Sequence, residues 1–140
     1  MKVAKFRVAR PTENLNALRA FYIDALGLVD GGSFENHNGY DGFLVSTDDA
    51  AYEIEFTQHP NVACPAPTGD NVLVFYFESE SEIVPVAHRL AGHGIAPITP
   101  LNPYWIGKGL TYTDPDGYCV VLFDLEALAR SRAQSGTTSP

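Results

Sequence analysis

Hydrophobic and polar side chains alternate at the start of the chain, and a helical spacing follows. In K-V-A-K-F-R-V-A-R, Phe6 and Val8 fall on one face while Lys5 and Arg7 fall on the other. This period of two is typical of a half-buried strand whose charged side chains point away from the core. Apolar residues then recur every three or four positions, which predicts a helix over about 12–26.

Shorter apolar runs follow, bounded by residues that favour turns. Three strands are predicted at about 28–35, 42–47 and 51–58, separated by E-N-H-N-G-Y and T-D-D-A. The next segment, 59–70, holds three of the ten prolines and cannot continue as a helix or a central strand. We therefore interpret this segment as a linker.

The same order of elements repeats after the linker. A strand at 71–77 leads to a helix that begins near Ser81, and a short strand is expected in I-A-P-I-T. Two final strands are joined by the turn from Asp114 to Gly117. The predicted fold class is therefore α+β, with eight strands in two tandem βαβββ modules. We expect module one at 1–59, the linker at 60–70, module two at 71–127, and a polar, flexible tail at 128–140.

The charge composition indicates which classes of binding partner to expect. Nine Lys and Arg against seventeen Asp and Glu give a net charge of −8, which repels phosphate backbones and anionic membrane surfaces. Nucleic acid and membranes are therefore not expected as partners. The start of the chain lacks the apolar segment of a signal peptide, and no run reaches the roughly 20 apolar residues of a membrane-spanning helix. Because the two cysteines, Cys64 and Cys119, follow no paired ligand spacing, reduced thiols and a cytoplasmic location are expected.

Two short motifs carry a family resemblance. A-L-R-A-F-Y-I-D-A-L-G-L in the first module and D-P-D-G-Y-C-V-V-L in the second resemble the two signatures of the vicinal oxygen chelate superfamily, over about residues 3–125. This superfamily includes glyoxalase I, extradiol dioxygenases, fosfomycin-resistance enzymes and bleomycin-resistance proteins. Within it, the chain is most similar to small glyoxalase-like bacterial proteins. The resemblance implies curved sheets that enclose a cleft, helices packed outside them, and a homodimer.

In metal-dependent members of the superfamily, the first and last strands of each module supply one metal ligand apiece. Carried over onto this sequence, the four positions are Arg7, Glu55, Asn71 or Leu73, and Val121. A guanidinium and an aliphatic side chain cannot ligate a metal, and an amide is a poor ligand for a transition metal. The resemblance therefore implies a protein without a metal cofactor, in which Glu55 alone is retained.

Strand alternation indicates which side chains share the implied cleft face. Along 51–59, Glu53, Glu55 and His59 point one way, and the apolar side chains between them point toward the helix. By the same rule Arg7 lies on the cleft face of the first strand, so we expect its guanidinium within hydrogen-bonding reach of Glu55. This pair is either purely structural or contacts a ligand.

Aromatic residues complete the candidate binding site. Tyr104 and Trp105 follow Asn102 in the loop N-P-Y-W, and Phe75 lies on the first strand of module two. Exposed loops seldom carry Tyr and Trp without a packing or recognition purpose. The candidate ligand-binding residues are therefore Arg7, Glu55, His59, Asn71, Phe75, Asn102, Tyr104, Trp105 and Val121.

Two functions remain open from the sequence. The first is a metal-free protein that binds a small organic molecule, such as a drug or a metabolite, between aromatic walls, with Glu55 and Arg7 fixing its orientation. The second is a metal-dependent lyase, isomerase or dioxygenase of the glyoxalase type, with Glu55 as general base and a divalent metal that stabilises an enediolate. The unsuitable ligand positions favour the binding protein.

Overall fold

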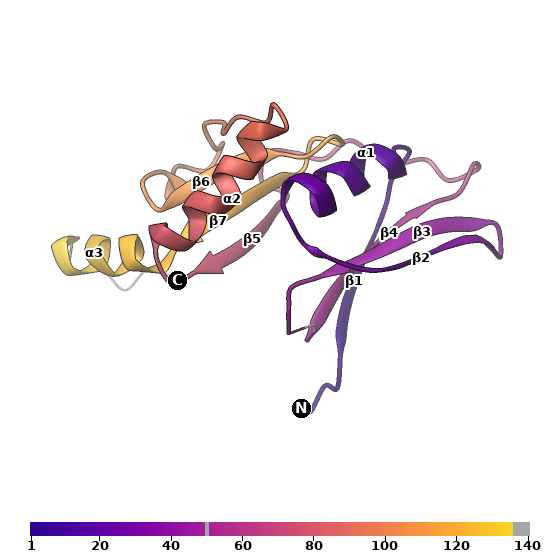
Figure 1. The fold of residues 1–140 in the computed structure, drawn as a ribbon, viewed down its shortest axis with the longest axis horizontal. Coiled ribbons are helices and arrows are strands. Elements are labelled where there is room, and N and C mark those ends of the chain that lie inside the picture. The colour runs from indigo at the N-terminus through magenta and orange to yellow at the C-terminus, as the bar shows by residue number, and fades with distance from the viewer. Residues whose placement is uncertain (50, 136–140) are drawn as a thin grey trace. The chain divides into compact units, whose positions relative to one another are not determined.

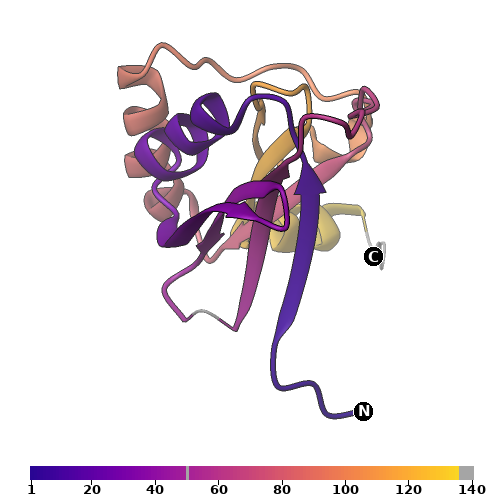
Figure 2. The same ribbon diagram turned by 90° about the vertical axis from the view of Figure 1, so that its right-hand side faces the viewer.

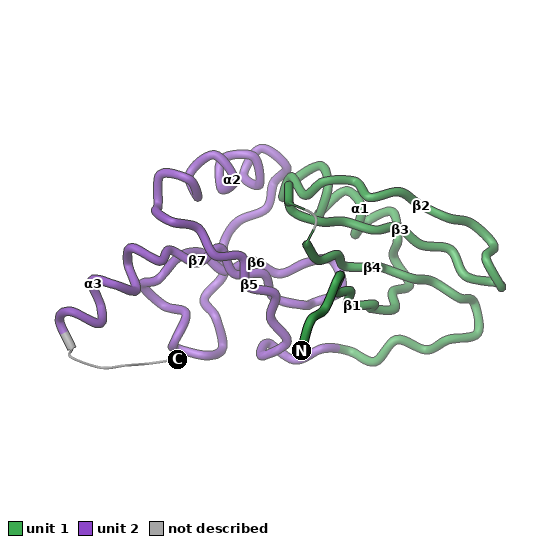
Figure 3. Tube along the Cα trace, turned by 90° about the horizontal axis from the view of Figure 1, so that it is seen from below, with its two compact units in different colours: residues 1–66 green, residues 67–140 purple. Residues whose placement is uncertain are grey.

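The chain forms two β-sheets, one in each of two units that span residues 1–66 and 67–140 (Figure 3). The computed structural model describes residues 1–49 and 51–135. Both units begin with a strand and a helix; three strands follow in unit 1, whereas two strands and the helix α3 (Leu125–Ser135) follow in unit 2, and this arrangement confirms the mixed α+β class with two modules (Figure 1). The boundary between the units lies inside the proline-rich segment that the sequence analysis interprets as a linker.

Unit 1 contains a four-stranded sheet in the order β1-β4-β3-β2. Strand β1 runs parallel to β4 along one edge, as Figure 2 shows, and the other neighbours are antiparallel. A short α-helix and a π-helical turn occupy the predicted helical region, and Gly27 ends it with a φ of 90° in the left-handed region. The elements are β1 (Phe6–Pro11), α1 (Leu15–Arg19), η1 (Ala20–Ala25), β2 (Val29–His37), β3 (Tyr40–Ser46) and β4 (Tyr52–Gln58).

The core of unit 1 is aromatic. The ring of Tyr22 in η1 stacks on Phe56 of β4 at 4.8 Å between ring centres, and Phe43 of β3 lies 5.1 Å from Phe56. All three side chains are buried, together with Leu18 of α1. The apolar positions of the predicted helix and the even-numbered positions of β4 therefore meet, as their spacing indicates.

The first strand departs from its predicted pattern. Phe6 and Val8, expected on the core face, are 61% and 43% exposed, whereas Arg10 on the same face is buried. The guanidinium carbon of Arg10 lies 4.8 Å from the centre of the Phe56 ring, and Nη2 donates a hydrogen bond to the Tyr22 hydroxyl at 3.3 Å. Because a guanidinium stacks on aromatic rings, an arginine occupies the core position that alternation assigns to an apolar residue.

Unit 2 contains a three-stranded sheet in the order β5-β7-β6, with β5 parallel and β6 antiparallel to β7. Helix α2 packs against β5 and β7. Within residues 1–49 and 51–135, no helix has both the length and the apolar character that a bilayer crossing requires. The elements are β5 (Val72–Phe77), α2 (Glu80–Gly92), η2 (Pro103–Trp105), β6 (Gly109–Thr113), β7 (Cys119–Asp124) and α3 (Leu125–Ser135).

The eighth strand predicted in I-A-P-I-T is reduced to one bridge. The backbone N–H of Ile98 donates to the Thr111 carbonyl at 2.7 Å, and pairing stops there. Pro97 and Pro100 flank this bridge on its own segment. Since proline has no N–H to donate, the ladder cannot extend far in either direction. The described part of the chain therefore forms seven strands rather than eight.

The tail also differs from its prediction. Helix α3 continues to Ser135, although flexible chain was expected from residue 128; residues 136–140 lie outside the described residues. One carboxylate oxygen of Asp124 accepts hydrogen bonds from two backbone N–H groups of the first turn, at 2.9 and 3.1 Å. Leu128 is buried against the apolar side chains of β7. The Asp124 cap and the buried Leu128 thus stabilise a helix that the polar composition of the segment did not predict.

Candidate functional site

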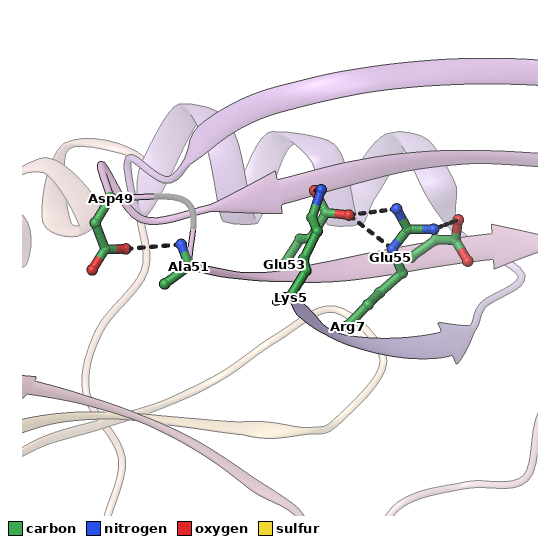
Figure 4. A network of polar contacts seen from close by, with 6 residues as sticks. All are labelled: Lys5, Arg7, Asp49, Ala51, Glu53 and Glu55. Atoms are coloured by element: carbon green, nitrogen blue, oxygen red, sulfur yellow. Dashed lines mark hydrogen bonds and ion pairs between the residues drawn. The ribbon is translucent and has the colours of Figure 1, made fainter. Parts of the chain in front are cut away.

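Four charged side chains form a network on the polar face of β1 and β4 (Figure 4). The strand register places Arg7 opposite Glu53. Nε and Nη2 of Arg7 both donate to Glu53 Oε1, the first at 2.8 Å, while Nη1 reaches Glu55 Oε2 at 3.5 Å. Lys5 Nζ lies 3.2 Å from Glu53 Oε2. The predicted contact between Arg7 and Glu55 is present, but Glu53 is the main partner of the guanidinium.

Glu53 is the anchored carboxylate of this network. Its side chain is 13% exposed, whereas the side chain of Arg7 is 46% exposed. The hydrogen bond from Arg7 is the largest effect and lowers the pKa of Glu53; burial opposes it, and Lys5 adds to the lowering. Glu55 makes one contact at the distance limit of a hydrogen bond, so its oxygens keep capacity to accept others.

The residues at the superfamily's metal positions do not fit a divalent metal. Arg7 is a cation already paired with two carboxylates, and Val121 is a fully buried aliphatic side chain. Within the described ranges, no three His, Cys, Asp or Glu side chains lie close enough together to hold a metal ion. Glu55 is therefore the one suitable donor among the four positions, and no metal-dependent step can be assigned to it.

Strand β5 presents a different set of side chains from the predicted one. Its register with β7 places Val74 opposite Val121. Directly paired residues share a sheet face, so Val74 and not Leu73 lies on the face of Val121. Phe75 lies on the opposite face, with its partner Leu122. Phe75 and Val121, both predicted to bind the ligand, therefore lie on opposite faces of this sheet, and contact of Phe75 with a ligand stays a prediction.

Asn71 precedes β5 and organises its first turn. Its Oδ1 accepts from the Thr68 N–H at 2.8 Å, and its own N–H donates to the Thr68 carbonyl at 3.0 Å. Its carbonyl accepts from the N–H of Cys119 at 3.0 Å. The structure therefore gives Asn71 a part in closing the turn and in starting the pairing of β5 with β7.

A hollow of about 510 Å³ opens on the Val121 face of unit 2. This volume lies in the range of about 300–1,000 Å³ that small-molecule sites occupy. The hollow contains two residues that the sequence analysis predicted, Asn102 and Trp105, and four that it missed. The lining consists of Asp70, Val72, Val74, Leu101, Asn102 and Trp105.

Hydrogen bonds and ring packing on β7 fix the loop that contains Trp105. Asn102 Oδ1 accepts from the Tyr104 N–H at 3.0 Å and so caps the short helix η2. The rings of Tyr104 and Trp105 pack on Phe123 of β7, at 6.4 and 5.8 Å between ring centres. Lys108 Nζ donates to the Tyr104 carbonyl at 2.8 Å. Tyr104 therefore supports the wall, and Trp105 forms it.

Among the described residues that line the hollow, Asp70 alone has an ionisable side chain. Its backbone N–H donates to Thr68 Oγ1 at 3.2 Å, which fixes the turn. The adjacent Gly69 lies so close to Leu101 that a Cβ on it would come within 3.1 Å of the Leu101 Cβ. The turn before β5 and the loop before η2 are thus in contact, and together they form the rim.

His59 lies at the end of β4, and loop contacts fix its position. Its Nδ1 accepts from the Asn61 N–H at 3.1 Å, and its ring lies 4.7 Å from that of Tyr40. A Cβ on Gly39 would come within 2.9 Å of His59 Nε2, so the turn needs glycine there. These contacts account for His59 structurally, and its contact with a ligand stays a prediction.

A larger hollow of about 700 Å³ lies in unit 1, between the start of α1 and the β2–β3 hairpin. It contains none of the predicted site residues, and its lining includes the carboxylates of Glu13, Glu35 and Asp41. Three carboxylates in one hollow disfavour an apolar or anionic ligand, whereas the hollow of unit 2 has one carboxylate beside an indole ring and three aliphatic side chains. The hollow of unit 2 is therefore the better candidate, although it is the smaller one.

Comparison with known proteins gives the family. The YycE-like N-terminal domain matches residues 6–57, and the YycE-like C-terminal domain matches residues 70–124. The uncharacterized protein YycE of Bacillus subtilis (strain 168) is 36% identical over 129 residues, which cover 91% of this chain and 93% of that protein. A crystal structure of a YycE protein of unknown function from Bacillus subtilis matches with a TM-score of 0.79 and 38% identity, over 86% of this chain and 89% of that one.

More distant structures share the fold. TnmS3, an antibiotic binding protein from Streptomyces sp. CB03234, matches with a TM-score of 0.62 and 21% identity, over 89% of this chain and 95% of that one. A glyoxalase/bleomycin resistance protein from the same organism matches with a TM-score of 0.61 and 19% identity, over 87% of this chain and 100% of that one. The chain therefore belongs to the YycE-like family and has the fold of the glyoxalase, bleomycin resistance and fosfomycin resistance proteins.

Proposed function

We propose that this protein binds a small organic molecule, without a metal, in the hollow of unit 2. The observation that carries the proposal is the composition of the lining, in which an indole ring and three aliphatic side chains adjoin one carboxylate and one amide. Apolar walls supply affinity at about 25 cal/mol per Å² of apolar surface removed from water, and a few polar groups fix orientation.

One protein of the same fold gives an example of this class of function. TnmS3, which shares the fold, is an antibiotic binding protein. Glu55 is the one residue that the glyoxalase mechanism could use as a base, and the Arg7 guanidinium already contacts its carboxylate at 3.5 Å, in a charged network on unit 1. Contact of Arg7 and Glu55 with the ligand stays a prediction, which Glu55→Gln tests separately.

Trp105 supplies the readout for the test, because it is the only tryptophan of the chain and lines the hollow. Small molecules would be screened by thermal shift, and each stabilising compound would be titrated against Trp105 fluorescence. A native-state ligand at 100 times its dissociation constant adds about 2.7 kcal/mol of stability.

Val74→Phe fills the hollow and is expected to weaken binding at least tenfold, whereas Val84→Phe on the exposed side of α2 should leave binding unchanged. A compound that stabilises both variants equally and leaves Trp105 emission unaltered would contradict the proposed site.

The metal-free part of the proposal has its own test. Protein purified from cells grown with trace metals is expected to hold less than about 0.1 equivalent of nickel, zinc, iron or manganese by elemental analysis, because three of the four positions offer no suitable donor. A stoichiometric metal that is lost in Glu55→Ala would instead favour the enzyme.

We also propose that the protein is a homodimer, as the superfamily resemblance implies; a mass near 15.2 kDa by light scattering at all micromolar concentrations would exclude it. A cytoplasmic location, expected from two cysteines that form no disulfide, likewise stays a prediction.

A further inference from the structure

The hollow of unit 2 contains a negative charge, on Asp70, for which the described residues provide no ion-pair partner. Asp70 is exposed, and no described residue forms an ion pair with its carboxylate. Lys108, on the same loop as Trp105, directs its ammonium group to the Tyr104 carbonyl at 2.8 Å, and the ammonium lies 4.4 Å from the centre of the Tyr104 ring. Within residues 1–49 and 51–135, the lining therefore presents one negative charge and no positive charge.

The apolar wall beside Asp70 has a rigid aromatic surface. Trp105 meets Tyr104 and Phe123 edge to face, with angles of 85° and 87° between ring planes, so two neighbours hold the indole. Indole is the aromatic side chain that attracts cations most strongly through its face. Val72 and Val74 supply aliphatic surface next to it.

From these observations we infer that the hollow selects an organic cation, in which an ammonium group is joined to an apolar or aromatic body, and that Asp70 determines this preference. The inference rests on the proposed function, since it names the class of ligand that the same hollow takes. An anion would meet the Asp70 carboxylate with no cation in the lining to offset it. A neutral molecule could bind the apolar wall, but Asp70 would contribute nothing to its affinity.

The test uses three probes that share a phenyl ring and differ in charge: benzyltrimethylammonium, benzyl alcohol and phenylacetate. Each is titrated against Trp105 fluorescence at low ionic strength and again at 0.5 M salt. The ammonium probe is expected to bind about fivefold or more tighter than the alcohol at low salt, and phenylacetate most weakly. The preference should shrink at high salt, because exposed charges are screened.

Asp70→Asn keeps the size of the side chain and removes its charge. It is expected to bring the ammonium probe to the affinity of the alcohol and to leave the alcohol unchanged. Glu78→Gln is the matched control, since it removes an exposed carboxylate of unit 2 outside the lining. Thermal melts of both variants check that they fold as the unaltered protein does.

The outcomes distinguish failure of the predicted cation preference from failure of the proposed binding site. If the alcohol binds as tightly as the ammonium probe, the inference fails while the proposed binding site stands. The same holds if Asp70→Asn leaves the affinities of both probes unchanged. Equal losses in Asp70→Asn and Glu78→Gln would assign the preference to the net charge of −8 and would also overturn the role of Asp70. If no probe alters Trp105 emission at millimolar concentration, both the inference and the proposed site are rejected.

Discussion

The guanidinium of Arg7 controls the ionisation of Glu53, and this is measurable at a single residue. Replacing Arg7 with Ala removes the hydrogen bond that lowers the pKa of Glu53, so the pKa is expected to rise toward the ordinary value for Glu. Carboxyl ¹³C shifts followed against pH measure it. Arg130→Ala, which removes a cation near Asp124 and Glu126, should leave the pKa of Glu53 unchanged.

The same shift gives a pH dependence of stability with a defined sign. The pKa of Glu53 is lower in the folded than in the unfolded protein, so its pairing stabilises the fold above the unfolded pKa. That contribution is lost as pH falls through the lowered folded value. The stability difference between the unaltered protein and Arg7→Ala should therefore be largest near neutral pH and shrink in acid. A difference that grows in acid would contradict this assignment.

Gly109 shows how one residue permits the pairing of β6 with β7. Its φ is +146°, and a Cβ there would lie 1.9 Å from the Leu122 carbonyl oxygen of the neighbouring strand. Gly109→Ala is therefore expected to cost about 3 kcal/mol or more in urea unfolding. Gly92→Ala, near the end of α2 with open space around it, should be neutral or stabilising by up to about 1 kcal/mol. Equal losses at both sites would contradict a special role for the positive φ and the close approach at Gly109.

The alternation of side chains along a strand correctly predicted which residues of β4 face Arg7 on the neighbouring strand β1. The polar set on β4, including Glu53 and Glu55, faces Arg7 as the period of two indicates. On β5 the count carried over from the superfamily put Asn71 or Leu73 on the face of Val121, whereas the register puts Val74 there. Because every residue of this strand is apolar, the sequence does not show which residues lie on which face of the sheet, and an error of one residue cannot be detected from it. The carboxylate of Asp70 was missed because it lies in a turn before the strand.

At the scale of elements, α3 depends on the residue that joins it to β7. Asp124→Ala removes the side-chain acceptor for two N–H groups of the first turn and is expected to lower stability by about 1 kcal/mol. Asp124→Asn keeps an acceptor oxygen and should lose less than half as much. Urea unfolding measures stability, and hydrogen exchange of α3 amides measures local opening. Equal losses in both variants would show that charge, not the hydrogen bonds, stabilises the helix.

Most elements were predictable, and the failures have identifiable causes. Prolines on either side of Ile98 prevent the strand that the apolar pattern of its segment suggests. Helix α3 was missed because the segment after Leu128 is polar and aperiodic. The signal that could have found it is local: an aspartate followed by L-E-A-L-A, which is a cap before a run of strong helix formers.

At the scale of the whole molecule, the segment between the two units is expected to act as a spacer. Residues 61–66 form no helix or strand, and Pro65 and Ala66 are exposed. Six Gly and Ser residues inserted between Pro65 and Ala66 should therefore cost less than about 1 kcal/mol in urea unfolding, since each doubling of a flexible loop costs only about 0.6 kcal/mol.

The same insertion in the turn between β6 and β7 provides the contrast. There Asp114 Oδ1 accepts from the N–H groups of Asp116 and Tyr118 at 2.9 and 3.0 Å, and the N–H of Gly117 donates to the Asp114 carbonyl at 2.9 Å. Six residues placed between Pro115 and Asp116 break this set, and at about 1 kcal/mol for each bond the loss should exceed 2 kcal/mol. If the insertion after Pro65 were the more costly of the two, the proline-rich segment would have to hold a fixed conformation that folding requires, and the spacer interpretation would be wrong.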